Sequence, residues 1–278
     1  MSSSSRARRR CFEPPGTVQE RLFLNGGIGS EDRDAYGKNG TLSAIARACY
    51  QGFDSAVSLY LTRDEQIVGS VGPTLPIPTA DHPDGVTHVR IRELDAREIF
   101  DFQSLRDRVY RIDSPLAIAG QTSMLMTRLH TREEDGVTDP VRVARSLEAA
   151  FGLFYRGPGL WLAVEDPELY RMLLRSSGEE GGHSAGCLPR LRLGWVADSD
   201  EDQPPSDCPS PSFVLHAPGA GNGAEVAGRS HVLWAPTYTP ARAQKLIDQS
   251  GAVAAVPMSV GVDQAWMLSE DEEAPVSA

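Results

Sequence analysis

The stretch Gly182–Gly186, which reads GHSAG, fits the G-x-S-x-G pattern that places a serine nucleophile on a sharp turn in many hydrolases. Such a serine needs a histidine to take its proton and an acid to orient that histidine. His216 and His231 follow Ser184 along the chain, with acidic residues in between. The candidate catalytic residues of this alternative are therefore Ser184, His216 and His231.

The residues around Ser184 argue against this alternative. A nucleophile elbow requires a buried strand before the serine and a helix after it. The preceding LLRSSGEEGG is polar and flexible in character, and Pro189 interrupts the segment that follows. The acids that could complete a triad, Asp198 and Asp200, lie in a polar tract rich in serine and proline. We therefore expect Ser184 to lie in a solvated loop, without an activating base.

The sequence predicts no metal or cofactor site. The glycine-rich stretch Gly219–Gly228 lacks the lysine and the Ser/Thr of a P-loop. The six histidines are dispersed without an H-E-x-x-H pattern, and the four cysteines form no C-x-x-C pair. These spacings indicate reduced thiols and no metal ion.

Charge is concentrated in separate segments of a chain whose net charge is −11. This negative net charge argues against nucleic-acid binding by the core, because the phosphate backbone is also negative. The acidic segments are Asp198–Asp202 and Ser269–Glu273. A basic arm, predicted to bind anions or to direct nuclear import, consists of Arg6, Arg8, Arg9 and Arg10.

Three serines have the surroundings of kinase substrates. Ser199 and Ser269 are each followed by three acidic residues, and Ser210 is followed by proline. Phosphates added there would extend the negative charge and could dock these segments onto an arginine-rich partner. We expect these three serines to be phosphorylation sites, and the alternative is that the acidic segments only keep the chain soluble.

Composition places the chain among globular proteins, with 40% hydrophobic and 23% charged residues. No run approaches the roughly 20 apolar residues of a membrane helix, and no apolar run follows the N-terminal arginines as in a secretory signal. We expect an intracellular protein of the nucleus or cytoplasm, neither secreted nor membrane-spanning. Lys38 and Lys245 are the only lysines, a bias typical of GC-rich genomes.

Four helices have clear start signals. Thr41 precedes an apolar repeat that reaches about Gln51, and Thr239-Pro240 opens a helix that Gly251 should end. Asp139-Pro140 and Asp166-Pro167 open the other two, because Asp caps a helix and Pro is tolerated at its first position.

The expected strands include a hairpin formed by residues 55–62 and 65–71, followed by a proline-rich loop over 72–85. Hairpins mixed with helical crossovers favour an α+β fold with a mixed, largely antiparallel sheet and packed helices. The predicted organisation is a disordered basic arm (1–17), an α+β core (18–196), a disordered acidic Pro/Ser linker (197–211), a C-terminal α+β segment (212–269) and an acidic tail (270–278).

These features together favour a non-enzymatic interaction protein that binds a protein partner, such as an accessory or virion-associated protein of a GC-rich DNA virus. A serine-dependent hydrolase using Ser184 is the alternative from another class. A cytosolic actinobacterial protein of unknown role is the third.

Overall fold

The structure is a computed structural model that describes twelve stretches of the chain. They are residues 22–29, 40–78, 85–102, 105, 108–119, 123–131, 139–154, 159–177, 191–199, 202–216, 230–257 and 260–261.

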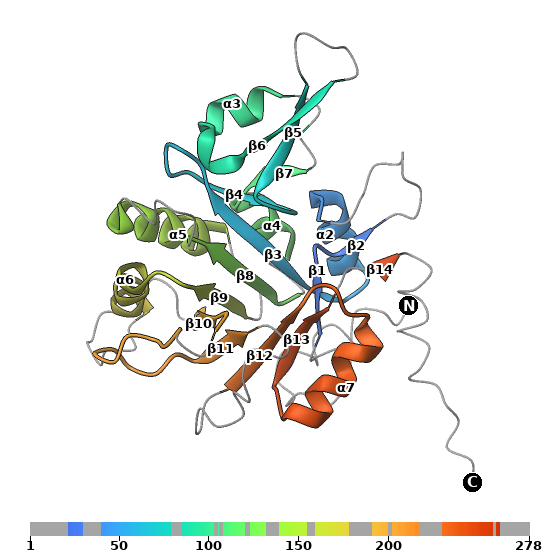
Figure 1. The fold of residues 1–278 in the computed structure, drawn as a ribbon, viewed down its shortest axis with the longest axis vertical. Coiled ribbons are helices and arrows are strands. Elements are labelled where there is room, and N and C mark those ends of the chain that lie inside the picture. Colours follow the sequence, from blue (N-terminus) through green and yellow to red (C-terminus); the bar gives the residue numbers. More distant parts are fainter. Residues whose placement is uncertain are drawn as a thin grey trace.

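The main sheet contains parallel strands that curl around a common interior (Figure 1). In the order of their pairing these strands are β1 (Phe23–Asn25), β3 (Asp54–Leu61), β8 (Leu125–His130), β9 (Leu160–Val164), β10 (Leu191–Ala197), β11 (Phe213–His216), β12 (Ser230–Ala235) and β13 (Ala254–Pro257). A parallel bridge between Leu22 and Ala255 brings β13 back beside β1. The curled sheet thus has the form of a parallel α/β barrel.

The barrel interior is a packed apolar core. Alternate residues of each strand face inward, which is why Phe23, Trp161 and Phe213 meet there. Gly194 on β10 makes room for the Phe213 ring, because a Cβ at this glycine would overlap that ring. The core therefore depends on a large and a small residue at neighbouring positions of paired strands.

Helices cover the outer face of the strands, and all of those named below except α4 begin at a predicted start signal. They are α2 (Leu42–Tyr50), α4 (Asp113–Ala119), α5 (Pro140–Phe154), α6 (Pro167–Ser177) and α7 (Pro240–Ser250). Asp139 and Asp166 cap α5 and α6 by accepting hydrogen bonds from main-chain N–H groups. Thr239 caps α7, which Gly251 ends in a left-handed conformation. The four helix predictions are confirmed.

Cys49 on α2 is buried against β3, as its place in the apolar repeat predicts. Burial raises the pKa of its thiol to about 11. The thiol is therefore protonated at neutral pH and packs as a small apolar group.

The connection between β10 and β11 differs from the others. Its described residues, 198–199 and 202–212, contain no helix. Instead, the Asp202 carbonyl accepts a hydrogen bond from Trp195 of β10, and Asp207 pairs with Arg171 of α6 at 2.9 Å. Part of the predicted linker thus contacts β10 and α6. Residues 1–17 and 270–278 lie outside the described part of the chain. The predicted domain boundaries therefore stay a prediction.

An excursion between β3 and α4 rises above one end of the barrel (Figure 1). It comprises β4 (Ile67–Ser70), β5 (Thr74–Pro78), β6 (Val86–Arg90), the 3-10 turn η2 (Ile91–Glu93), α3 (Ala96–Asp101) and β7 (Val109–Arg111). The predicted hairpin is confirmed by the antiparallel pairing of β3 with β4. The predicted loop over 72–85 is wrong in its first half, where β5 pairs with β6. Prolines are tolerated in such a two-stranded ribbon, because its outer edge needs no N–H donors.

The predicted α+β class with a largely antiparallel sheet is wrong. The antiparallel pairs of the main sheet are confined to β3–β4 and β4–β7, and the other pairs are parallel. The β3–β4 hairpin is a local addition to a parallel barrel. A hairpin is recognisable from a short stretch of sequence, whereas the crossovers that join parallel strands are long, so the antiparallel pairing was overestimated. A two-stranded parallel pair, β2 (Ile28–Gly29) with β14 (Val260–Gly261), stands beside the barrel.

The interior packing at Gly194 predicts a stability loss in Gly194→Ala. The added methyl group must displace the Phe213 ring in a filled core, and such overpacking costs about 1–3 kcal/mol in the free energy of unfolding. Gly72→Ala is the matched control, since a Cβ there meets nothing within 4 Å. Urea unfolding should show a lower midpoint for Gly194→Ala alone, and equal midpoints for both variants would contradict the packing described.

Candidate functional site at the barrel mouth

Parallel strands bring their carboxyl ends to one rim of the barrel, the rim at which active sites of such barrels lie. Asn25 ends β1, and Ser58 of β3 and Arg128 of β8 occupy paired, inward-facing positions one step beyond the core residues Ala56 and Met126. Glu165 and Asp198 directly follow β9 and β10. We call the rim formed by these five residues the barrel mouth.

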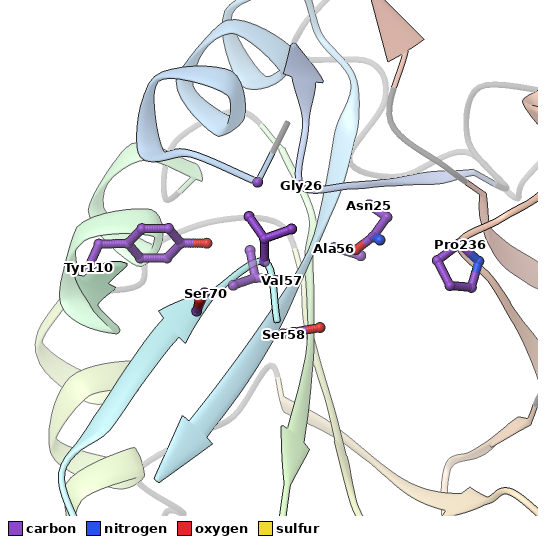
Figure 2. A pocket seen from close by; sticks show the side chains of 10 residues that line it. Asn25, Gly26, Ala56, Val57, Ser58, Ser70, Tyr110 and Pro236 are labelled. Carbon is purple, nitrogen blue, oxygen red and sulfur yellow. The ribbon is translucent and has the colours of Figure 1, made fainter. Parts of the chain in front are cut away.

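A hollow of about 220 Å³ opens at the mouth between β1, β3 and the excursion (Figure 2). Its side chains are mostly small or neutral and polar. The lining residues are Asn25, Gly26, Gly40, Ala56, Val57, Ser58, Ser70, Val71, Tyr110 and Pro236. Because amide and hydroxyl groups can both donate and accept, the hollow suits a hydroxyl-bearing ligand.

The turn after β1 forms one wall of this hollow. Gly26 and Gly27 have φ angles of 70° and 79°, in the left-handed region that favours glycine. A Cβ at Gly27 would lie 2.7 Å from the Ile45 nitrogen, so this turn also packs directly on the first turn of α2. The Gly26 N–H donates to the Ala56 carbonyl at 2.8 Å, which ties the turn to β3.

The opposite wall is formed by β4 and β7. Tyr110 pairs with Gly69, and its ring lies across that glycine, where a Cβ would overlap it. The ring is buried, and its hydroxyl points into the hollow (Figure 2). Gly69 thus positions a hydroxyl group at the wall facing Asn25.

A buried arginine lies beside the hollow. Arg128 is the register partner of Ser58, and its side chain is only 9% exposed. Its Nη2 donates to Asp198 Oδ2 at 2.7 Å and lies 3.6 Å from Glu165 Oε2. The guanidinium also lies 5.5 Å from the centre of the Trp234 ring, within the range of a cation–π contact. Among the described residues, the Arg128 Nε–H has no hydrogen-bond partner.

The two carboxylates beside Arg128 differ in their surroundings. Glu165 is 2% exposed, and its Oε1 accepts from the Thr131 N–H at 2.6 Å. Asp198 is 39% exposed. A buried charge requires a partner and further hydrogen bonds, so Arg128 and Glu165 stabilise each other and Asp198 adds a contact at the solvent side.

His130, at the end of β8, stacks on the Tyr60 ring with centroids 4.7 Å apart. Burial, reinforced by the positive charge of Arg128, lowers the pKa of His130 to about 3. His130 is therefore neutral at pH 7 and packs on Tyr60, which belongs to the apolar cluster of the excursion.

Of the residues of the predicted serine site, the structure describes His216 and His231, which lie side by side on neighbouring strands. Ser184 lies outside the described residues. His216 and His231 alternate with the inward-facing Leu215 and Val232, so both point away from the barrel interior, with ring centroids 5.5 Å apart. The use of Ser184 as a nucleophile stays a prediction.

Most of the predicted regulatory residues also lie outside the described part, namely Arg6, Arg8, Arg9, Arg10 and Ser269. Ser199 and Ser210 are described, and both are exposed. Their phosphorylation stays a prediction. The described residues contain no group of three or more His, Cys, Asp or Glu that could hold a metal ion. No helix in the described stretches is long and apolar enough to cross a membrane.

The cluster of Arg128 with its two carboxylates was not predicted from the sequence. The available signal was a single charged residue, Arg128, two positions after an apolar residue that faces the barrel interior. A second signal was Glu165, which directly follows a wholly buried strand. Arg128 and Glu165 can be recognised as neighbours only when their strands are assigned to adjacent positions in a barrel.

The buried pair predicts a large stability loss in Arg128→Met. This change leaves the Glu165 carboxylate buried without its cation, at a cost of about 3–5 kcal/mol in the free energy of unfolding. The double variant Arg128→Met/Glu165→Gln should recover part of that loss. Arg171→Met breaks the exposed pair with Asp207 and should cost no more than about 1 kcal/mol. Equal losses for the two single variants in urea unfolding would contradict the role assigned to Arg128.

The neutral state of His130 predicts an acid-sensitive stability. Its pKa of about 3 in the folded chain lies below the value of 6.5 for an unperturbed histidine, so the unfolded chain binds the proton more readily. The resulting stabilisation is complete above pH 6.5 and is lost as the pH falls toward 3, by up to about 1.4 kcal/mol per pH unit.

His130→Phe keeps a ring for stacking on Tyr60 but cannot take up a proton. Denaturant unfolding at pH 7, 6 and 5 should show a shallower loss of stability in this variant than in the parent chain. Identical pH dependence in the two chains would rule out a neutral, buried His130.

Comparison with solved structures identifies the fold. A glycerophosphodiester phosphodiesterase from Parabacteroides distasonis superposes with a TM-score of 0.59 at 13% identity, covering 91% of this chain and 98% of that chain. A phosphodiesterase from Oleispira antarctica, in complex with the product sn-glycerol-3-phosphate, gives 0.55 at 12% identity, covering 85% and 92%. The glycerophosphodiester phosphodiesterase of Thermotoga maritima gives 0.51 at 10% identity, covering 93% and 99%. No model of a protein family matches the sequence, and neither does any curated protein.

The prediction of a non-enzymatic interaction protein of a DNA virus is wrong. The three solved structures named above share the fold over nearly their whole length and are phosphodiesterases, and none of them supports a viral protein or a location in a host nucleus. Arginine-rich composition and charged segments are properties of codon usage and of the surface, and neither reports on the fold. The chain has the barrel fold of the glycerophosphodiester phosphodiesterases.

Proposed function

We propose that this chain binds a small phosphate ester of a polyol, of the glycerophosphodiester type, in the barrel mouth. The observation that carries the proposal is the buried, positively charged Arg128 beside a hollow of neutral hydroxyl and amide groups. A guanidinium is suited to phosphate oxygens, and the hollow is suited to the hydroxyls of the alcohol portion. One solved neighbour holds sn-glycerol-3-phosphate, which supports this class of ligand.

Three features make the mouth a prepared site. Glu165 and the Trp234 ring hold the guanidinium in place before a ligand arrives, so that little side-chain freedom is lost on binding. Ser58 is the register partner of Arg128, which places a hydroxyl of the hollow next to the cation. Tyr110 supplies a second hydroxyl from the opposite wall (Figure 2).

The proposal concerns recognition of the ester. Hydrolysis of a phosphodiester needs a group that takes a proton from water and a group that gives one to the leaving alkoxide. Tyr110 is the titratable side chain among the residues that line the hollow, and the nearby carboxylates contact Arg128. We therefore assign binding to the mouth, and phosphodiester hydrolysis stays a property of the named neighbours.

Titration calorimetry with sn-glycerol 3-phosphate and with a glycerophosphodiester tests the proposal directly, with neutral glycerol as the comparison. Both phosphate esters should bind more tightly than glycerol, because only they carry a negative charge for Arg128. Following product release in the same samples shows whether a bound diester is also cleaved. Equal or absent binding of all three compounds would contradict the proposal.

Tyr110→Phe removes one hydroxyl from the hollow and should weaken binding of sn-glycerol 3-phosphate about three- to tenfold, the equivalent of one hydrogen bond. Tyr50→Phe is the matched control, because Tyr50 is 93% exposed on α2. A loss of affinity in both variants, or in neither, would place the ligand elsewhere.

A further inference from the structure

We propose that Asp198 occupies the position of the ligand's phosphate at Arg128 and competes with it, so that ligand binding requires the Asp198 side chain to leave the guanidinium. This inference rests on the proposed function, because it concerns how the same mouth takes up an anion. It assigns to Asp198 the role of an internal competitor.

The geometry distinguishes Asp198 from Glu165. Both carboxylates approach the same nitrogen, Arg128 Nη2, but Asp198 is the closer, at 2.7 Å against 3.6 Å. Glu165 is buried and receives a second hydrogen bond, from Thr131. Asp198 is 39% exposed, and Arg128 is its hydrogen-bond partner among the described residues. Asp198 is therefore the carboxylate that can exchange with an anion from solution.

Arg128 keeps its place when Asp198 leaves. Glu165 still balances its charge, and Trp234 still faces its guanidinium. The cation that Asp198 releases is consequently both positioned and short of one anionic partner. A phosphate oxygen can replace a carboxylate oxygen on an arginine with a similar charge-assisted hydrogen bond.

Asp198 is held near the mouth by the segment that follows it. The Ser199 N–H donates to Asp202 Oδ2 at 2.9 Å, and the Asp202 carbonyl accepts from Trp195 Nε1 at 3.0 Å. These bonds tie Ser199 to Asp202 and Asp202 to β10, and neither of them uses the Asp198 carboxylate. Exchange thus needs only the Asp198 carboxylate to give up its bond to Arg128.

The competing carboxylate lowers the measured affinity, because only the fraction of molecules with a released Arg128 can bind the ligand. Asp198→Asn removes the negative charge, keeps the size of the side chain and should strengthen binding of sn-glycerol 3-phosphate and of inorganic phosphate about tenfold. Affinity for neutral glycerol should not change.

Asp207→Asn is the matched control. It makes the same change in net charge and also removes one carboxylate from an arginine, but that arginine is Arg171 on the outside of the barrel. Calorimetry on the full chain and both variants should show a gain in affinity for phosphate and sn-glycerol 3-phosphate in Asp198→Asn alone. Binding that is measurable only in Asp198→Asn would equally support the inference.

Two results would overturn the inference while the proposed function stands. The first is binding by the parent chain with less than about a twofold change in Asp198→Asn. The second is the same gain in Asp207→Asn, which would reveal a general effect of net charge. A third result, no binding of either phosphate compound by any of the three chains, would overturn the proposed function and this inference together.

Discussion

The parallel direction of the barrel strands is the constraint on which the site depends. It sends every strand's carboxyl end to the same rim, so that residues far apart in the sequence meet there. Asn25 and Ser58 come from the first two barrel strands, whereas Glu165 and Asp198 follow β9 and β10. The inward-facing residues below them form a filled apolar core, so the mouth is a hollow above a packed base.

Burial of Arg128 imposes the second constraint. A guanidinium that is only 9% exposed must be balanced by negative charge, and Glu165 supplies it from the neighbouring strand end. The same balance determines the chemistry of the mouth, because a cation fixed beside neutral hydroxyl groups is a site for an anion with a polar alcohol portion. Under the proposed function, structural stability and ligand recognition use the same arginine.

Local signals in the sequence were sufficient for elements but not for their assembly. The Thr239 cap and Gly251 determine the ends of α7 within a few residues, and the β3–β4 hairpin is also a local structure. Parallel pairing joins strands that are distant in the sequence, and no local pattern reports it. A barrel is indicated by a sequence in which strands and helices alternate. This alternation is interrupted between β10 and β11, because the described part of their connection contains no helix.

The same limit applied to the site. Arg128 lies in a strand that reads as ordinary and apolar, and its partners Glu165 and Asp198 become neighbours only through the barrel register. The GHSAG motif is recognisable because its residues are contiguous in the sequence, although Ser184 lies outside the described residues. A short contiguous motif can be recognised in a sequence, whereas a site built from residues of several strands can be recognised only in the folded chain.

A crystal structure of the chain with sn-glycerol 3-phosphate tests the central claim most directly, because it locates the phosphate without reference to any variant. We predict phosphate density at the barrel mouth, within hydrogen-bond distance of the Arg128 guanidinium, with the glycerol portion in the hollow lined by Ser58 and Tyr110. Density for the ligand at another place on the molecule, with Arg128 still contacting Asp198, would contradict it.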